Sequence, residues 1–268
     1  MISPLATYGH GTENDFVLVF DPDGVQEFSA ETIARICDRK TGIGADGLIR
    51  ILKRDGTWFM DYRNRDGSIA EMCGNGIRVM ARYLVDRGYQ RQGIFPINTR
   101  SGKKFLSVPE TGDITVNMGQ IAIESGDVIC DDLEEHNTGI RVNVGNPHAV
   151  FFVNSLEKVG DLKVAPKLTP VFPEGMNVEF VEERSDGELN MRVHERGVGE
   201  TRSCGTGTCA VAMAATFRHG GKLPSKWVIH PPGGRLEVEI DAHSNAILTG
   251  PALLVRDVDL SKFLEKQI

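Results

Sequence analysis

The sequence predicts an α+β protein of two pseudo-symmetric domains, each a strongly curved, mainly antiparallel sheet wrapped around a central helix. Three observations lead to this prediction: one constant spacing relates the two halves, each half contains many short strand-like segments, and each half contains one dominant apolar helix. We expect residues 1–121 to form the first domain and residues 122–252 the second. The tail, residues 253–268, has no counterpart in the repeat, and we expect it to pack back onto the first domain.

The repeat is visible as matching residues at a fixed distance along the chain. Cys204 follows Cys73 by 131 residues (204 − 73), and each cysteine leads into a Gly-x-Gly turn and a helix-forming run. The same spacing aligns several residues without a gap: Gly44 with Gly175, Met60 with Met191, Arg65 with Arg196, Gly74 with Gly205, Gly76 with Gly207 and Gly102 with Gly233. Near the N-terminus the register slips by one, so that Asn14 aligns with Asn146. Such an internal duplication predicts two thiols on opposite sides of one cleft.

Composition restricts the class of protein. With 268 residues, 40% of them hydrophobic and 25% charged, the chain has the composition of a soluble globular protein. The net charge of −7 and the pI near 5.6 argue against nucleic acid or an anionic membrane as the main partner. No stretch approaches the roughly 20 apolar residues of a membrane span, and no signal peptide is evident, so we expect a cytoplasmic protein. The five cysteines form no CxxC pair and no disulfide framework, which indicates free thiols.

The first half opens with a glycine-bearing turn at residues 9–13, which leads into a strand at residues 14–20. Ser29 is expected to cap a short helix that extends to Asp38. The Cys73 turn then starts a helix that ends before Gly88, with its core-facing residues at helical spacing: Ile77, Met80, Ala81 and Leu84. Further strands are expected at residues 48–52, 57–62, 94–99, 104–108 and 114–118.

The second half repeats this order of elements. Strands are expected at residues 140–144, 149–153, 177–181, 189–194, 227–229, 236–240 and 246–248. A proline-bearing loop between Asp161 and Pro173 replaces the short helix of the first half. The helix after Cys204 is apolar on every side from Cys209 to Ala215, which predicts burial all round by the sheet.

The two cysteine turns predict acid–base chemistry at a carbon atom. Each turn lies where a loop becomes a helix, so backbone N–H groups point at whatever binds beside the cysteine, and thiolate is favoured over thiol. Two opposed thiols can remove a proton from one face of a carbon and deliver one to the other face. The same N–H groups can stabilise charge that develops on an adjacent carboxylate. With no glycine-rich phosphate loop, no evident pyridoxal lysine and no metal-ligand spacing of histidines, we expect neither cofactor nor metal.

Several motifs resemble those of the diaminopimelate epimerase family. Glu71–Arg78, and Glu195–Thr201 together with Cys204–Gly207, are similar to the two signatures of that family. Gly42–Gly47, Gly145–His148 and Gly175–Phe180 look like further family motifs, so the resemblance covers nearly the whole chain. It implies a cofactor-independent epimerase, hence an isomerase, that interconverts LL- and meso-2,6-diaminopimelate in lysine and peptidoglycan-precursor synthesis. It also implies, commonly, a homodimer.

The resemblance implies roles for individual residues by matching motif. Cys73 and Cys204 would be the two acid–base residues, and His148 and Glu195 would lie near the thiols, orienting the substrate ammonium and assisting proton movement. Backbone N–H groups would hold the carboxylate at the reacting centre, from Gly74, Asn75, Gly205 and Thr206. Side chains would bind the remaining polar ends of the substrate: Asn14, Asn64, Asn146, Asn177 and Arg196. Arg196 suits the distal carboxylate because its planar guanidinium can bind a carboxylate through two hydrogen bonds.

The same residues also allow other interpretations. Asn14 follows Gly-His-Gly-Thr-Glu rather than the family's usual lead-in, and Gly47 stands where many members have glutamine, so no binding role is transferred to Gly47. The remaining cysteines are interpreted as buried structural residues: Cys37, Cys130 and Cys209. One alternative function is another cofactor-independent amino-acid racemase, of the proline-racemase kind. A second is a non-catalytic amino-acid-binding relative that has lost turnover.

Overall fold

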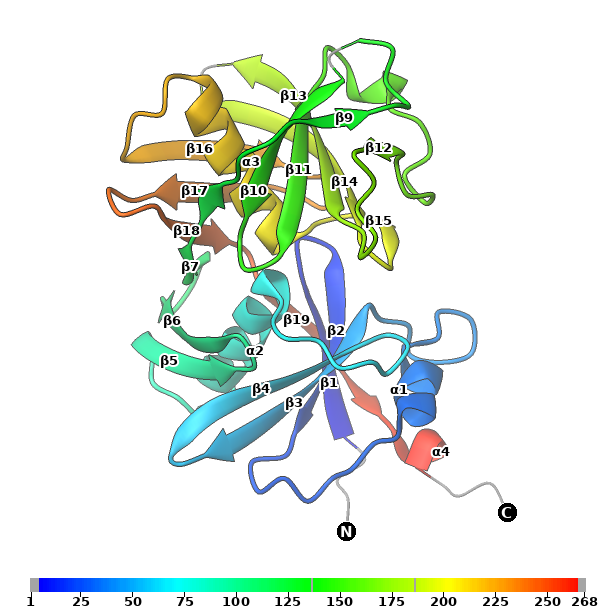
Figure 1. Cartoon of the computed structure of the whole chain (residues 1–268). Coiled ribbons are helices and arrows are strands. Elements are labelled where there is room, and N and C mark those ends of the chain that lie inside the picture. The colour runs from blue at the N-terminus through cyan, green and yellow to red at the C-terminus, as the bar shows by residue number, and fades with distance from the viewer. Residues whose placement is uncertain (1–4, 136, 186, 265–268) are drawn as a thin grey trace. The chain divides into compact units, whose positions relative to one another are not determined.

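The computed structural model describes residues 5–135, 137–185 and 187–264, which form two compact units (Figure 1). The described residues up to Val116, together with those from Pro251 onward, make the first unit, and Asn117–Gly250 make the second. The division falls a few residues before each boundary expected from the repeat. Its first boundary lies inside strand β7 (Ile114–Gln120).

The first unit is a sheet in which each strand pairs with the next in a simple series. Its strands are, in spatial order, β19 (Leu253–Asp259), β1 (Leu5–Gly11), β2 (Asn14–Phe20), β3 (Gly47–Arg54), β4 (Thr57–Asn64), β5 (Gly93–Thr99), β6 (Gly102–Val108) and the start of β7. The β2–β3 and β4–β5 pairs are parallel, and the others are antiparallel. Its helices are α1 (Ala30–Cys37), α2 (Gly74–Asp86) and the short α4 (Ser261–Leu264).

The second unit repeats this series. Its main strands are β10 (Thr138–Asn143), β11 (Pro147–Phe152), β13 (Asn177–Ser185), β14 (Glu188–Glu195), β16 (Ser225–His230), β17 (Leu236–Ile240) and β18 (Asn245–Gly250). Only β11–β13 and β14–β16 in this series are parallel, at the places equivalent to the parallel pairs of the first unit. Smaller elements complete it: β8 (Ala122–Ile123), β9 (Val128–Cys130), η1 (Leu156–Lys158), β12 (Leu168–Thr169), β15 (Gly199–Thr201) and α3 (Gly205–Arg218). The shared topology confirms the predicted fold class.

Each sheet curves around one helix. In the first unit α2 packs against β1, β2, β3, β6 and β19, and in the second α3 packs against β8, β10, β11, β13, β16, β17 and β18 (Figure 1). The predicted core face of α2 is fully buried, and α3 is buried from Gly207 to Thr216, which confirms the two sequence patterns. The Ser29 hydroxyl caps α1, as predicted, by accepting a hydrogen bond of 3.2 Å from the Thr32 N–H. No helix of the described residues has both the length and the apolar content needed to cross a bilayer.

One local prediction is wrong. Residues 9–11 were expected in a turn, but they lie in strand β1, and the turn shrinks to Thr12 and Glu13, whose φ angles are 50° and 60°. β1 is held by β2 on one side and by β19 on the other. A Cβ on Gly9 would lie 2.6 Å from the Leu253 carbonyl oxygen, so the glycine there permits close strand approach rather than a turn.

Candidate functional site

The first cysteine site is the start of helix α2. Cys73 is the N-cap residue, in an extended conformation with φ −135° and ψ 122°, and it is half-buried. Its Sγ lies 3.4 Å from Oδ1 of Asn14 on β2, and the Asn75 side-chain amide donates to that oxygen over 3.2 Å. The N–H groups in the first turn of a helix have no partner within the helix, so the backbone of Gly74 and Asn75 suits a bound anion.

A charged cluster fixes the orientation of the Asn14 amide. Its Nδ2 donates to the Asp46 carboxylate over 2.8 Å, which turns Oδ1 toward Cys73. Arg39 binds both Asp46 and Asp15, at 2.7 and 2.9 Å. Burial acts to raise the pKa of Asp15, but hydrogen bonds from Arg39 and Tyr8 outweigh it and hold that pKa below the usual value. The amide oxygen of Asn14 is therefore held in place as a hydrogen-bond acceptor for the Cys73 thiol.

The second cysteine site is the start of helix α3. Cys204 is again the N-cap residue, with φ −125° and ψ 118°, nearly the same backbone as Cys73. Its Sγ accepts from the Gly207 N–H at 3.4 Å and lies 3.4 Å from the Thr206 hydroxyl. Burial, with the charges of Glu195 and Glu179, raises the pKa of Cys204 well above its ordinary value. The expectation that a helix start favours thiolate is therefore wrong for Cys204, which rests as a thiol.

In the same unit as Cys204, the predicted residues Asn177 and Arg196 are joined by a hydrogen bond. The Asn177 side chain accepts from the Arg196 backbone N–H at 3.0 Å and donates to the Pro147 carbonyl at 3.1 Å. The Arg196 side chain is exposed, and its guanidinium makes a hydrogen bond of 3.4 Å to the Glu174 carbonyl. Its neighbour Glu195, at the end of β14, accepts a hydrogen bond from the Thr201 hydroxyl on β15. These contacts join β11, β13 and β14 at the ends that carry the predicted residues.

His148 forms a fully buried pair with Glu179, a residue that the sequence did not single out, and also contacts the half-buried Asn146. Its Nδ1 is 2.7 Å from Glu179 Oε1, and both side chains are 0% exposed. Its Nε2 is 3.0 Å from Oδ1 of Asn146. Glu179 stood within a family-like motif without an assigned role. A signal was available: the repeat pairs Glu179 with Leu48, so a carboxylate replaces a buried apolar residue.

Asn64 is the predicted site residue that the structure leaves outside these groups. It ends β4, and its side-chain amide donates to the Ser68 hydroxyl at 3.0 Å, within the turn that follows the strand. The other predicted residues of the first unit meet at Cys73. In the second unit three groups form: Cys204 with Gly205, Thr206 and the charge of Glu195, His148 with Asn146, and Asn177 with Arg196.

The remaining cysteines behave as core residues. Cys37, Cys130 and Cys209 are 2%, 0% and 0% exposed. Burial raises the pKa of Cys37 to about 12 and also raises that of Cys130, so neither thiol ionises near neutral pH. Within the described part of the chain, no group of three or more His, Cys, Asp or Glu side chains is arranged to hold a metal ion.

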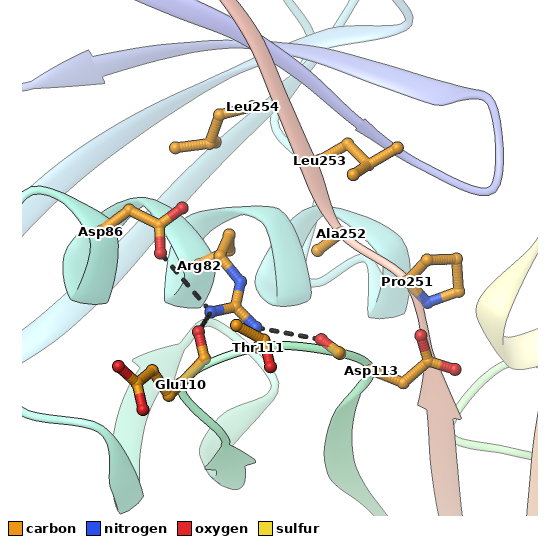
Figure 2. Close-up of a pocket in the computed structure, with 10 residues that line it drawn as sticks. Arg82, Asp86, Glu110, Thr111, Asp113, Pro251, Ala252, Leu253 and Leu254 are labelled. Atoms are coloured by element: carbon orange, nitrogen blue, oxygen red, sulfur yellow. Dashed lines mark hydrogen bonds and ion pairs between the residues drawn. The ribbon is translucent and has the colours of Figure 1, made fainter.

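A groove of about 350 Å³ lies elsewhere in the first unit, between the later turns of α2, residues 110–113 and residues 251–254 (Figure 2). Figure 2 shows the Arg82 guanidinium directed at Asp86 and at the backbone of Glu110. Arg82 also donates to the carbonyls of Pro109 and Gly112, at 3.1 and 3.0 Å. Because its donors are taken by backbone carbonyls, Arg82 ties the loop to the helix rather than offering a charge to a ligand.

Comparisons with known proteins identify the family of this chain. The family model described as diaminopimelate epimerase matches residues 6–123 and 140–255. The diaminopimelate epimerase of Streptomyces coelicolor is 44% identical over 267 residues, which cover 93% of this chain and 92% of that protein. The diaminopimelate epimerase of Corynebacterium glutamicum is 42% identical over 265 residues, with 92% and 94% covered.

Solved structures with low sequence identity share the fold. A phenazine biosynthesis protein of the PhzF family from Bacillus anthracis superposes with a TM-score of 0.74 at 16% identity, covering 97% of this chain and 99% of that one. A probable proline racemase from Agrobacterium radiobacter K84 gives a TM-score of 0.72 at 15% identity, with 98% and 94% covered. At such identities the likeness concerns the fold alone.

Proposed function

The chain belongs to the diaminopimelate epimerase family and is an isomerase, and we propose that it interconverts LL- and meso-2,6-diaminopimelate without a cofactor. The observation that carries this proposal is the pair of equivalent helix starts, each capped by a cysteine and followed by Gly-x-Gly. One thiol from each unit acts on the same alpha carbon. One removes a proton, and the other delivers a proton to the opposite face.

The different environments of the two thiols support different roles, one as proton donor and one as proton acceptor. Cys204 rests as a thiol because of its burial and the carboxylates of Glu179 and Glu195, so it suits the role of proton donor. Cys73, which is more exposed than Cys204, takes the proton in that direction of the reaction. After turnover the protonation states are exchanged, and the enzyme is ready for the reverse reaction.

Binding of the substrate's polar groups follows from the same residues. The first-turn N–H groups of both helices hold the carboxylate at the reacting centre, where negative charge develops in the transition state: Gly74, Asn75, Gly205 and Thr206. The exposed guanidinium of Arg196 binds the distal carboxylate. Asparagine side chains contact the remaining polar ends: Asn14, Asn64, Asn146 and Asn177. His148 and Glu195 orient the substrate ammonium.

We further propose that the enzyme acts in the cytoplasm, in lysine and peptidoglycan-precursor synthesis, as a homodimer. The acidic pI of about 5.6 suits a small-molecule enzyme rather than a nucleic-acid-binding protein. Sedimentation of the purified chain at micromolar concentration tests the dimer, and a species of 29.4 kDa alone would contradict it.

The decisive experiment follows deuterium during turnover. Incubation with LL-diaminopimelate in heavy water should produce the meso isomer with one deuterium at the inverted alpha carbon. Cys73→Ala and Cys204→Ala should each slow this conversion roughly 10²- to 10⁴-fold, the range expected for a lost acid–base group. Cys209→Ala is the matched control, because this buried cysteine lies on α3 one turn from Cys204.

Two results would contradict the proposal. One is inversion that persists without Cys73 or without Cys204. The other is wild-type protein that leaves LL-diaminopimelate unchanged. In that case inversion of proline would favour the racemase alternative, and binding of diaminopimelate without exchange would favour a non-catalytic relative.

A further inference from the structure

The buried carboxylate of Glu179 stands at a position that the first unit fills with an apolar side chain. Its strand, β13, runs parallel to β11 with Val150 opposite Glu179, just as β3 runs parallel to β2 with Val17 opposite Leu48. Leu48 and Glu179 are both 0% exposed. The same position of the same fold therefore accepts leucine in the first unit. Because burying a carboxylate costs free energy, its presence in the second unit indicates a function.

The contacts of Glu179 reach both His148 and the turn that carries Cys204. Oε1 receives Nδ1 of His148 at 2.7 Å. The same oxygen packs against Gly207, because a Cβ placed on this glycine would lie 2.6 Å from Oε1 and 3.3 Å from Cβ of Cys204. The other oxygen, Oε2, is buried without a hydrogen-bond partner among the described residues. Glu179 thus lies between the histidine and the helix start.

We propose that Glu179 is a positioning residue of the Cys204 site, which fixes the His148 imidazole through Nδ1 and keeps a negative charge against the Gly207 turn. This proposal rests on the proposed epimerase function for its kinetic readout. A carboxylate accepts hydrogen bonds only, so Glu179 requires a proton on Nδ1 of His148 and thereby fixes the orientation of the imidazole ring. Its charge also disfavours ionisation of Cys204 and keeps that thiol ready to donate.

The test is Glu179→Gln, which preserves shape and an acceptor oxygen and removes the charge. We expect kcat to fall at least about tenfold, with KM within about threefold, a smaller loss than the 10²- to 10⁴-fold of a group that transfers the proton itself. Glu179→Leu, which copies Leu48, should fold and lose at least as much activity. Glu182→Gln is the matched control on the same strand, because the Glu182 carboxylate accepts the Leu156 N–H at 2.8 Å, outside the Cys204 group.

Two further measurements do not require catalytic turnover. They therefore test the role of Glu179 independently of the proposed epimerase activity. In the wild-type protein the His148 Nδ1 proton should resonate far downfield, as expected for a hydrogen bond of 2.7 Å to a carboxylate, and Glu179→Gln should move it upfield. Alkylation of Cys204 at fixed pH should become faster in Glu179→Gln. If the wild-type protein fails to epimerise diaminopimelate, these two measurements still decide the role of Glu179. A folded Glu179→Gln protein with unchanged kcat, proton resonance and alkylation rate would overturn it.

Discussion

Cys73 and Cys204 cap equivalent helices with nearly the same backbone angles, yet their surroundings differ. Cys73 is half-buried and faces the amide oxygen of Asn14, whose orientation is set by Asp46. Cys204 is 7% exposed, accepts from its own helix, and lies in the field of Glu179 and Glu195. Duplication preserved the geometry of the two turns, while the residues around them diverged so that two identical side chains differ in exposure and charge environment.

The largest difference should appear when the equivalent glycines Gly76 and Gly207 are each changed to alanine. Gly207→Ala would displace the Glu179 carboxylate, and we expect a loss of about 10²-fold in kcat/KM, as for an ångström-scale misplacement of a reacting group. In Gly76→Ala the new methyl would meet the ends of Ile49 and Met60 instead, at 2.9 and 3.0 Å. This change should cost about 1–3 kcal/mol of stability by overpacking and leave kcat/KM within about threefold. Equal losses of kcat/KM in Gly207→Ala and Gly76→Ala would contradict the expected difference between the two helix starts.

The next position to compare is Arg78 with its repeat partner Cys209. The Arg78 guanidinium is fully buried and donates to the Gly74 carbonyl at 3.1 Å and to the Pro251 carbonyl at 3.4 Å. Arg78→Met should lower the free energy of unfolding by about 2–3 kcal/mol, because buried acceptors lose a donor. Cys209→Ala should cost only about 1 kcal/mol for a small cavity. Urea unfolding of both variants measures the two losses of unfolding free energy. A larger loss for Cys209→Ala than for Arg78→Met would contradict the stabilising role of the Arg78 hydrogen bonds.

Chemical labelling should rank the thiols by their surroundings. With iodoacetamide at pH 8, Cys73 should react at least about tenfold faster than Cys204, because Cys204 is buried and its pKa is raised by that burial and by two carboxylates. Mass spectrometry of peptides from the partly labelled protein gives the ratio. The buried thiols of Cys37, Cys130 and Cys209 serve as internal controls and should stay unlabelled while the protein is folded. Labelling of Cys204 ahead of Cys73 would reverse the proposed resting states.

The smallest effect expected is on the pH dependence of stability. The folded-state pKa of Cys204 lies above its unfolded value of about 9, so above that pH the unfolded chain loses a proton that the folded protein keeps. Stability therefore falls as pH rises through this window, by up to about 1.4 kcal/mol per pH unit for this group. Cys204→Ala should flatten the alkaline decline of the unfolding free energy by up to that slope. Parallel curves for the variant and the wild type would show that Cys204 ionises equally in both states.

Local patterns were enough to predict most of the fold. The Ser29 cap, the core face of α2 and the all-apolar run of α3 are each encoded within one segment, and each is present in the structure. Strand β1 was missed because its evidence is not local. Gly9 resembles a turn residue until it is seen to pair with Leu254 of β19, 245 residues later (254 − 9).

The site shows the same division between local and distant causes. Both cysteine turns could be predicted, because the repeat marks them. The protonation state of Cys204 could not be predicted. The sequence around a helix start shows only the residues of that turn, whereas the charges that act on Cys204 belong to Glu179 on β13 and Glu195 on β14. For Asn64 the motif match predicts a site role but not the local contact, in which its amide donates to the Ser68 hydroxyl.

The pairing of β1 with β19 has a consequence for biosynthesis. The ribosome releases all of Asn117–Gly250 before β19 emerges, so the second unit can close while the first still lacks the strand that covers β1. A chain truncated after Gly250 would retain the whole second unit but expose a sheet edge along Leu5–Gly11, an open template for aggregation. Completion of the first unit thus waits until the whole of the second unit has been synthesised.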